Sequence, residues 1–137
     1  MKTLALLILL GICALRSEAI GECEVIAEAR AASLEGYKGY SLENYACLAF
    51  YASNYDTSFQ RTPDEFGIVQ INRMWCNVGP KDNNPCGIPC SSLLDNDLSD
   101  DMKCVKRIVQ DPNGLAAWNP WTEYCKDKDL SQFKCLS

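Results

Sequence analysis

Apolar residues recur at helical spacing near the start of the chain. Residues 22–32 are rich in alanine, glutamate and arginine, and Ile26 and Ala29 fall on one helical face. This pattern predicts a helix that buries one side. A second helix is expected to begin at Ser41, a good N-cap residue, and to close near residues 53–54. Its apolar positions recur with the same period: Leu42, Tyr45, Ala46 and Ala49.

The middle of the chain has a different pattern. Residues 56–64 are polar and contain Pro63, whereas residues 66–72 are rich in β-branched side chains and partly alternate between apolar and polar. The second stretch predicts one strand at the edge of a small sheet. Residues 77–90 contain prolines and glycines that break helices, so we expect a loop held by its cysteines.

The helical pattern returns in the last third of the chain. Asp100 and Asp101 fall in the first turn of a helix expected to begin at Ser99, where negative charge is favourable. The apolar stripe of this helix is predicted at Met102, Val105, Ile108 and Val109. A short fourth helix is expected after Asn119, because Pro120 suits the first helical position. Helices, a small β-rich insert and further helices predict an α+β domain.

Residues 1–19 have the pattern of an export signal. Lys2 precedes an apolar run that is too short to span a bilayer, and Ser17-Glu18-Ala19 resembles a cleavage site with small residues. The alternative is that this run is a buried core helix. With this export signal, we expect the protein to be secreted and extracellular, without a membrane span. Residues 20–137 are expected to form one domain, because 137 residues are too few for two well-filled cores.

Charge argues against several classes of partner. The chain has 13 basic and 18 acidic side chains, a net charge of −5, and losing residues 1–19 removes two basic and one acidic side chain, which makes it −6. Nucleic acid and acidic lipid repel such a protein at long range, so we expect no nucleic-acid partner. The same balance favours a bound cation.

Nine cysteines and no histidine narrow the available chemistry. Without histidine, catalysis would depend on carboxylates, hydroxyls, lysines or a metal. Cys13 falls within the expected export signal, and the remaining eight cysteines indicate a disulfide framework in an oxidising compartment. Eight cysteines permit many pairings, so the count leaves the connectivity open.

Four aspartates cluster in residues 95–101, at the entry to the third helix. Calcium takes oxygen ligands from carboxylates and loop carbonyls, which this segment can supply. An EF-hand loop does not fit, because its glycine position falls on Asp100 and its final glutamate on Lys106. A solvated acidic helix start is the alternative. Clustered like charges cost stability unless a cation neutralises them, which favours a metal.

Two further groups of residues are of types that bind or cleave saccharides in other proteins. Tryptophan and tyrosine stack on sugar faces but in a small domain are more often core residues, and they occur here as Trp75, Trp118, Trp121, Tyr45, Tyr51 and Tyr55. Asp64 and Glu65 supply the two carboxylates that a glycosidase uses. Adjacent residues on an extended segment point in opposite directions, so by themselves they are expected to be surface charges.

Eight cysteines and four sequence blocks together resemble a known family over essentially the whole mature chain. The blocks are Gly39-Tyr40-Ser41-Leu42, Phe66-Gly67-Ile68-Val69-Gln70-Ile71-Asn72, Trp75-Cys76 and Cys86-Gly87-Ile88-Pro89-Cys90. They resemble the C-type lysozyme and α-lactalbumin family, glycoside hydrolase family 22. The resemblance implies a helical α-lobe, a small β-lobe and a cleft between them. It also implies four disulfides: Cys23–Cys135, Cys47–Cys125, Cys76–Cys90 and Cys86–Cys104.

The acidic segment resembles the calcium loop of α-lactalbumins and of calcium-binding lysozymes. This resemblance implies calcium as a cofactor. The side chains of Asp95, Asp100 and Asp101 would bind the ion together with the backbone carbonyls of Ser92 and Asp97.

The catalytic pair departs from the lysozyme pattern. Lysozymes protonate the glycosidic oxygen with a glutamic acid at the end of the second helix, and Ala52 stands at that position. The second carboxylate falls on Glu65 in place of an aspartate, after a shortened hairpin. Losing a general acid costs ~10²–10⁴-fold, so we assign no catalytic residue. A rescue by Asp56 or Asp64 is the alternative. Family sugar positions are matched by Gln70, Asn72, Trp75, Asp111, Ala117 and Trp118, while Met74 replaces an aromatic residue.

The lost acid, the glutamate and the calcium loop together resemble α-lactalbumin more than lysozyme. That protein makes a β-1,4-galactosyltransferase accept glucose and form lactose without itself being a catalyst. Phe50 and the pair Gln132-Phe133 match its transferase-binding surface, so we predict that these residues bind a partner. Tyr51 and Trp118 depart from the α-lactalbumin pattern.

The sequence therefore predicts a secreted, calcium-binding, non-hydrolytic protein that acts as a binding or regulatory subunit. Its expected partners are a galactosyltransferase and a saccharide in the cleft. Two alternatives remain open, a C-type lysozyme that hydrolyses peptidoglycan and a saccharide-binding relative that does not cleave. Wall lysis and transferase acceptor choice discriminate between them.

Overall fold

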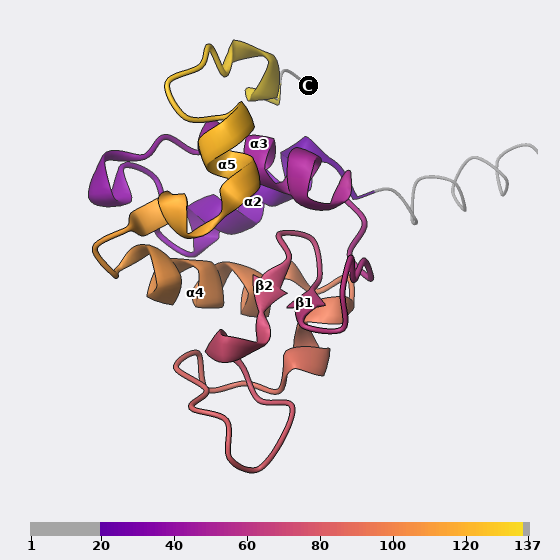
Figure 1. Ribbon diagram of the computed structural model, residues 1–137. Helices are drawn as coiled ribbons and strands as arrows, with labels where there is room; N and C mark the ends of the chain where they lie inside the picture. Colours follow the sequence, from indigo (N-terminus) through magenta and orange to yellow (C-terminus); the bar gives the residue numbers. More distant parts are fainter. Residues whose placement is uncertain (1–19, 136–137) are drawn as a thin grey trace, which may run out of the picture.

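The computed structural model describes residues 20–135, so the export signal expected at residues 1–19 lies outside the described residues. Helices α2 (Glu22–Ala31), α3 (Glu43–Ser53) and α5 (Asn119–Tyr124) form one lobe, in the upper part of Figure 1. Strands β1 (Glu65–Phe66) and β2 (Ile71–Asn72) and the loop after them form a smaller lobe below. The α+β prediction is confirmed.

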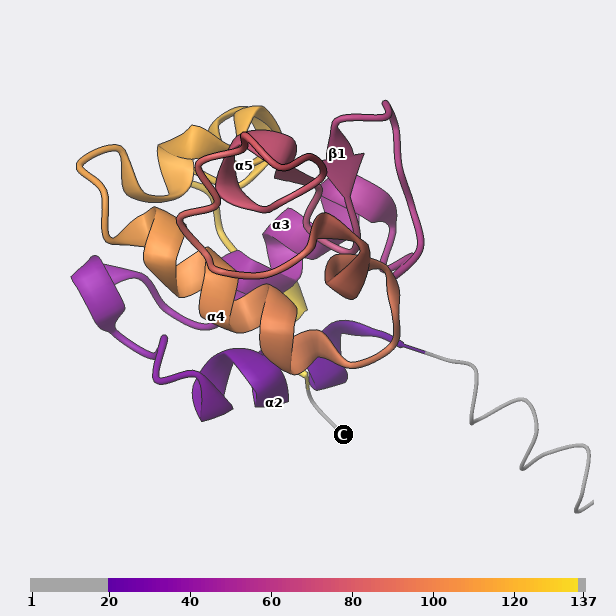
Figure 2. The same cartoon turned by 90° about the horizontal axis from the view of Figure 1, so that it is seen from below.

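Helix α4 (Leu98–Val109) lies between α2 and the smaller lobe, as Figures 1 and 2 show from two directions. Its predicted stripe is fully or almost fully buried, at Met102, Val105, Ile108 and Val109. Burying each such side chain stabilises the fold by about 1.5–3 kcal/mol. Helix α3 packs against both α2 and α5, and its buried residues Tyr45–Ala49 make it the centre of the core.

Two helix starts differ slightly from the sequence prediction. Ser41 does not cap α3, because its hydroxyl accepts a hydrogen bond from the Asn44 side chain at 3.0 Å and the helix begins one residue after Leu42. Helix α4 begins at Leu98, one residue earlier than expected, because the Asp97 carboxylate accepts from the Ser99 backbone N–H at 3.0 Å. Asp97 is therefore the N-cap residue.

The single strand predicted over residues 66–72 is wrong. The chain instead forms an antiparallel hairpin in which Glu65 pairs with Asn72 and Phe66 pairs with Ile71. It turns back because Gly67 and Gln70 both have positive φ, +85° and +55°. Apolar residues 68–69 lie in the turn and are fully buried, so their strand-like composition reflects burial rather than strand structure.

Four disulfides tie these parts together, with the same four pairings that the family resemblance implies. Cys23–Cys135 and Cys47–Cys125 fasten the C-terminal segment to α2 and α3. Cys76–Cys90 closes the predicted loop, and Cys86–Cys104 joins it to α4. In small secreted domains each such bridge is worth ~2–5 kcal/mol.

Candidate functional site

A small cavity of about 150 Å³ opens where α3, the hairpin and residues 117–120 meet. Ala52 from α3 and Glu65 from β1 both line it. The remaining lining residues are Arg61, Gln70, Asn72, Ala117, Trp118, Asn119 and Pro120. The structure therefore brings together both positions of the former catalytic pair and most of the matched sugar positions.

The acid position holds no proton donor. Ala52 is only 4% exposed and forms part of the cavity wall near the end of α3. The next residue, Ser53, donates from its hydroxyl to the backbone carbonyl of Ile68 at 2.6 Å, which fixes this end of the helix against the hairpin turn. A methyl group is thus held where the family has a carboxylic acid.

The second carboxylate is engaged by neighbours on the same loop. The Arg61 guanidinium donates to Glu65 Oε2 from Nη2 at 2.8 Å and from Nε at 3.2 Å. The Thr62 hydroxyl donates to Oε1 at 3.4 Å. Both carboxylate oxygens of Glu65 therefore have partners. Arg61 was not predicted as a site residue, and its only signal in the sequence is its position four residues before Glu65 in a short polar loop.

The two acids proposed as substitutes lie elsewhere. Asp64 does not line the cavity and pairs with Arg73, at 3.4 Å between Oδ1 and Nη1. The two neighbouring carboxylates therefore pair with different arginines. Asp56 lines a second hollow, which shares Ala52 with the first, and accepts hydrogen bonds from the backbone and side chain of Ser58 at 3.0 Å. Neither Asp56 nor Asp64 lines the cavity that contains Glu65.

Gln70 holds the shortened loop in place. Its buried side chain accepts from the Arg61 backbone N–H at 2.9 Å and donates to the carbonyls of Phe59 and Gly67 at 2.6 and 2.7 Å. These three bonds tie the loop before β1 to the turn after it. Gln70 therefore acts mainly as a structural residue, although it also lines the cavity.

Trp118, Trp121 and Tyr45 are buried, as expected for core aromatics, whereas Trp75 is half-buried. The Arg107 guanidinium lies over the Trp75 ring, 5.7 Å from its centroid, and also pairs with Asp111 at 2.9 Å. Arg107 thus contacts both Trp75 and Asp111, and neither of these two residues lines the small cavity. Met74 beside them is exposed.

The acidic segment follows a short 3₁₀ turn, Cys90–Leu94. Asp95 accepts from the Asp97 backbone N–H at 3.1 Å and Asp97 caps α4, so hydrogen bonds within the segment fix its shape. Both carboxylates are exposed. Within residues 20–135, no three acidic or cysteine side chains are gathered closely enough to form a metal site by themselves.

Asp101 is the unusual member of the segment. It is fully buried on α4, and neither carboxylate oxygen has a hydrogen-bond partner among the described residues. Burial is the main cause that raises the pKa of the Asp101 carboxyl, and the charges of Asp95, Asp100 and Asp97 add to it, so that the pKa rises from its usual 3.8 to about 8. An unpartnered buried carboxylate is costly unless a cation or a proton neutralises it. The chemistry of this buried carboxylate is therefore compatible with a nearby cation as well as with a bound proton.

Three exposed aromatic side chains form an aromatic patch, which we define as Phe50, Tyr51 and Tyr124; they are 39%, 39% and 47% exposed. Tyr51 stacks on Tyr124 with ring centroids 4.6 Å apart. Gln132 is exposed nearby in sequence, but Phe133 is only 6% exposed and packs against Phe50 at 6.1 Å. The prediction that Phe133 offers a docking surface is therefore corrected, because its ring is buried and packs against Phe50 instead of facing solvent.

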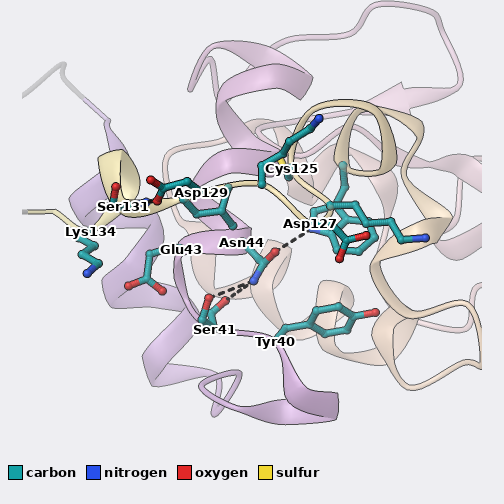
Figure 3. A pocket seen from close by; sticks show the side chains of 13 residues that line it. Tyr40, Ser41, Glu43, Asn44, Cys125, Asp127, Asp129, Ser131 and Lys134 are labelled. Atoms are coloured by element: carbon teal, nitrogen blue, oxygen red, sulfur yellow. Dashed lines mark hydrogen bonds between the residues drawn. The ribbon is translucent and has the colours of Figure 1, made fainter.

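A larger cavity of about 560 Å³ lies between the start of α3 and residues 125–134 (Figure 3). Asn44 lies at its centre and accepts from Trp121 Nε1 at 3.0 Å. It shares no lining residue with the cavity at Ala52, so it is separate from the cleft.

A family model described as C-type lysozyme/alpha-lactalbumin family matches residues 18–135. The chain belongs to this family. "Lysozyme C" of Pelodiscus sinensis is 47% identical over 120 residues, covering 82% of this chain and 92% of the relative. "Putative lysozyme C-2" of Rattus norvegicus is 42% identical over 142 residues, covering 97% and 96%. "Lysozyme C, milk isozyme" of Equus caballus is 40% identical over 119 residues, covering 82% and 92%.

The cavity at Ala52 and Glu65 contains the two positions that correspond, by the family resemblance, to the catalytic pair of lysozymes. The lysozyme-like architecture is kept, with its helical lobe, hairpin and four disulfides. No helix within residues 20–135 is both long and apolar enough to cross a membrane.

Proposed function

We propose that this chain is a secreted, calcium-stabilised and non-hydrolytic member of the family that acts as a saccharide-binding or regulatory protein. The observation that carries the proposal is the lining of the small cavity. Its only ionisable side chains are Arg61 and Glu65, which pair with each other, and Ala52 stands in the place of the acid. A retaining or inverting glycosidase needs two carboxyl groups flanking the bond.

The size of the expected defect supports this proposal. A positioned general acid contributes ~10²–10⁴-fold, which corresponds to about 3–5 kcal/mol of transition-state stabilisation. Neither Asp56 nor Asp64 lines the cavity that contains Glu65, which argues against either of them as a replacement acid. Any residual hydrolysis should therefore be slower than in a working lysozyme by at least this factor.

Binding does not need the missing acid. Asn72 and Asn119 supply amide groups in the cavity, and a half-exposed tryptophan lies beyond it at Trp75. Amides can hydrogen-bond sugar hydroxyl and acetamido groups, and an indole face packs on a pyranose ring. These groups suit an uncharged β-1,4-linked saccharide that is held and released intact.

The test combines a wall-lysis assay with binding of tri-N-acetylglucosamine measured by calorimetry. We expect measurable binding, weakened by Asn72→Ala, and no clearing of a bacterial wall suspension at catalytic protein concentration. Thr122→Ala, a change on the exposed side of α5, is the matched control and should bind like the unmodified protein. Clearing by the unmodified protein would overturn the proposal.

Calcium is part of the proposal. The buried, unpartnered Asp101 and its acidic neighbours support a cation held by the side chains of Asp95, Asp100 and Asp101 and the carbonyls of Ser92 and Asp97. Such an ion would supply positive charge that stabilises the fold, without a part in bond cleavage. Disulfides and the apolar N-terminal run support secretion.

The aromatic patch favours a second candidate function of the α-lactalbumin type. Exposed contiguous aromatics are enriched where proteins bind partners, and Phe50 and Tyr124 project from two different helices into one surface. If the partner is a β-1,4-galactosyltransferase, adding this protein should lower the transferase's apparent KM for glucose. An unchanged KM at high protein concentration would exclude that role.

A further inference from the structure

We propose that Arg61 is a second determinant of the non-hydrolytic cleft, acting independently of Ala52 by neutralising Glu65. The inference rests on the proposed function and extends it to a residue that the family comparison does not single out. The cleft would then select uncharged saccharides. It would disfavour a positive charge on the ligand at the place where a glycosidase transition state becomes positively charged.

The position of Arg61 is fixed by the fold. Its backbone N–H donates to the buried Gln70 amide, and Gln70 also holds the carbonyls of Phe59 and Gly67. The loop therefore runs back along the hairpin and cannot easily move the Arg61 backbone. From there the guanidinium reaches the carboxylate of Glu65 at 2.8 Å and lines the same cavity.

A glycosidase transition state carries oxocarbenium-like positive charge, which a free carboxylate stabilises. An arginine is always charged, so the Arg61–Glu65 pair offers the reacting carbon a net charge close to zero. A unit charge about 5 Å away at an effective dielectric constant of ~20 changes the equilibrium by about 10²-fold. Because the Arg61 side chain is 55% exposed, solvent screening reduces this to an effect of about 10-fold or more.

Uncharged ligands escape this penalty. The Gln70 amide is engaged with the backbone, so the amides of Asn72 and Asn119 are the groups that can recognise neutral hydroxyl and acetamido groups, with or without the arginine charge. Arg61 therefore acts through Glu65, by changing the net charge of the cavity rather than its shape. Its removal should alter discrimination between charged and uncharged ligands more than overall saccharide affinity.

The experiment compares two probes on the calcium-loaded, disulfide-bonded protein. One is a chito-oligosaccharide ending in a protonated iminosugar, and the other is the matching uncharged lactam. Calorimetry gives the ratio of their Kd values for the unmodified protein, Arg61→Gln and Arg61→Lys. We expect Arg61→Gln to shift the ratio toward the cationic probe by at least about 10-fold. Arg61→Lys, which keeps the charge, should stay within about 3-fold of the unmodified protein.

Glu65→Gln provides a test that does not require a change at Arg61. It leaves the guanidinium charge unpaired, so the ratio should move against the cationic probe. An unchanged ratio in Arg61→Gln, or an equal change for both probes, would overturn the proposal. Hydrolysis adds an independent measurement, because Ala52→Glu/Arg61→Gln should cleave faster than Ala52→Glu. Wall lysis by the unmodified protein would instead refute the proposed function, while the probe ratio would still report on Arg61.

Discussion

Neutralising Asp101 should control the stability of the whole domain. In the calcium-free fold the pKa of its carboxyl is raised to about 8, against 3.8 when the chain is unfolded. Between these values the folded form holds a proton that the unfolded form has lost. The contribution of Asp101 to calcium-free stability is therefore most favourable below about pH 4 and declines as the pH rises toward 8. At pH 7 the loss amounts to about 4 kcal/mol.

Calcium should reverse this loss, because an ion bound to the folded form replaces the proton. Mass action adds about 4 kcal/mol when free calcium is ~1,000 times Kd. For a domain of this size we expect an increase in Tm of about 10–20 °C at pH 7. The increase should be small near pH 4 and should grow until about pH 8. Calcium binding near pH 6 should also release about one proton per ion, measurable with a pH indicator dye.

Thermal unfolding in excess calcium and in excess chelator, at several pH values, is the assay. Asp101→Asn removes the buried charge, so the calcium-free variant should be more stable than the calcium-free unmodified protein at pH 7, and its calcium response should be lost. Asp127→Asn, an exposed acid far along the chain, is the matched control. Equal Tm values with calcium and with chelator across the pH range would refute the reasoning.

Three further outcomes are expected. Ala52→Glu alone should give at most weak wall lysis in a turbidity assay, because Glu65 remains paired; activity near that of a lysozyme would contradict this. Gly67→Ala should destabilise the protein by at least about 2 kcal/mol in urea unfolding, because an alanine would have to adopt the positive φ of this position and its Cβ would collide with the Leu93 carbonyl. An unchanged urea midpoint would contradict this. Tyr124→Ala should weaken binding of any partner at the aromatic patch at least 5-fold by calorimetry without changing Tm, whereas unchanged affinity would exclude the patch.

The helices could be predicted from the sequence because each buries one face at helical spacing, and on α4 the predicted stripe is the buried face. The hairpin could not. Ile68 and Val69 look like strand residues, yet they are buried in a turn whose reversal depends on the backbone angles of Gly67 and Gln70. Burial and strand structure favour the same side chains, so composition does not separate them.

The site shows a similar division. Ala52 and Glu65 could be assigned from the resemblance, and the structure places both in one cavity. The ion pair with Arg61 was missed because it depends on how the shortened loop folds back. The isolation of Asp101 was also hidden, since an aspartate in the first turn of a helix is ordinarily solvated and only tertiary packing removes its partners.

The turn of the hairpin lies close to the acidic segment at the start of α4. A Cβ built on Gly67 would stand 3.0 Å from Asp101 Oδ2, and the Thr57 hydroxyl donates to the Asn96 side chain at 2.7 Å across the same junction. Glu65 lies two residues before this glycine. A saccharide that steadies the hairpin and a cation that steadies Asp101 would therefore act on one common segment. By thermodynamic reciprocity, whatever calcium adds to sugar affinity, sugar must add to calcium affinity.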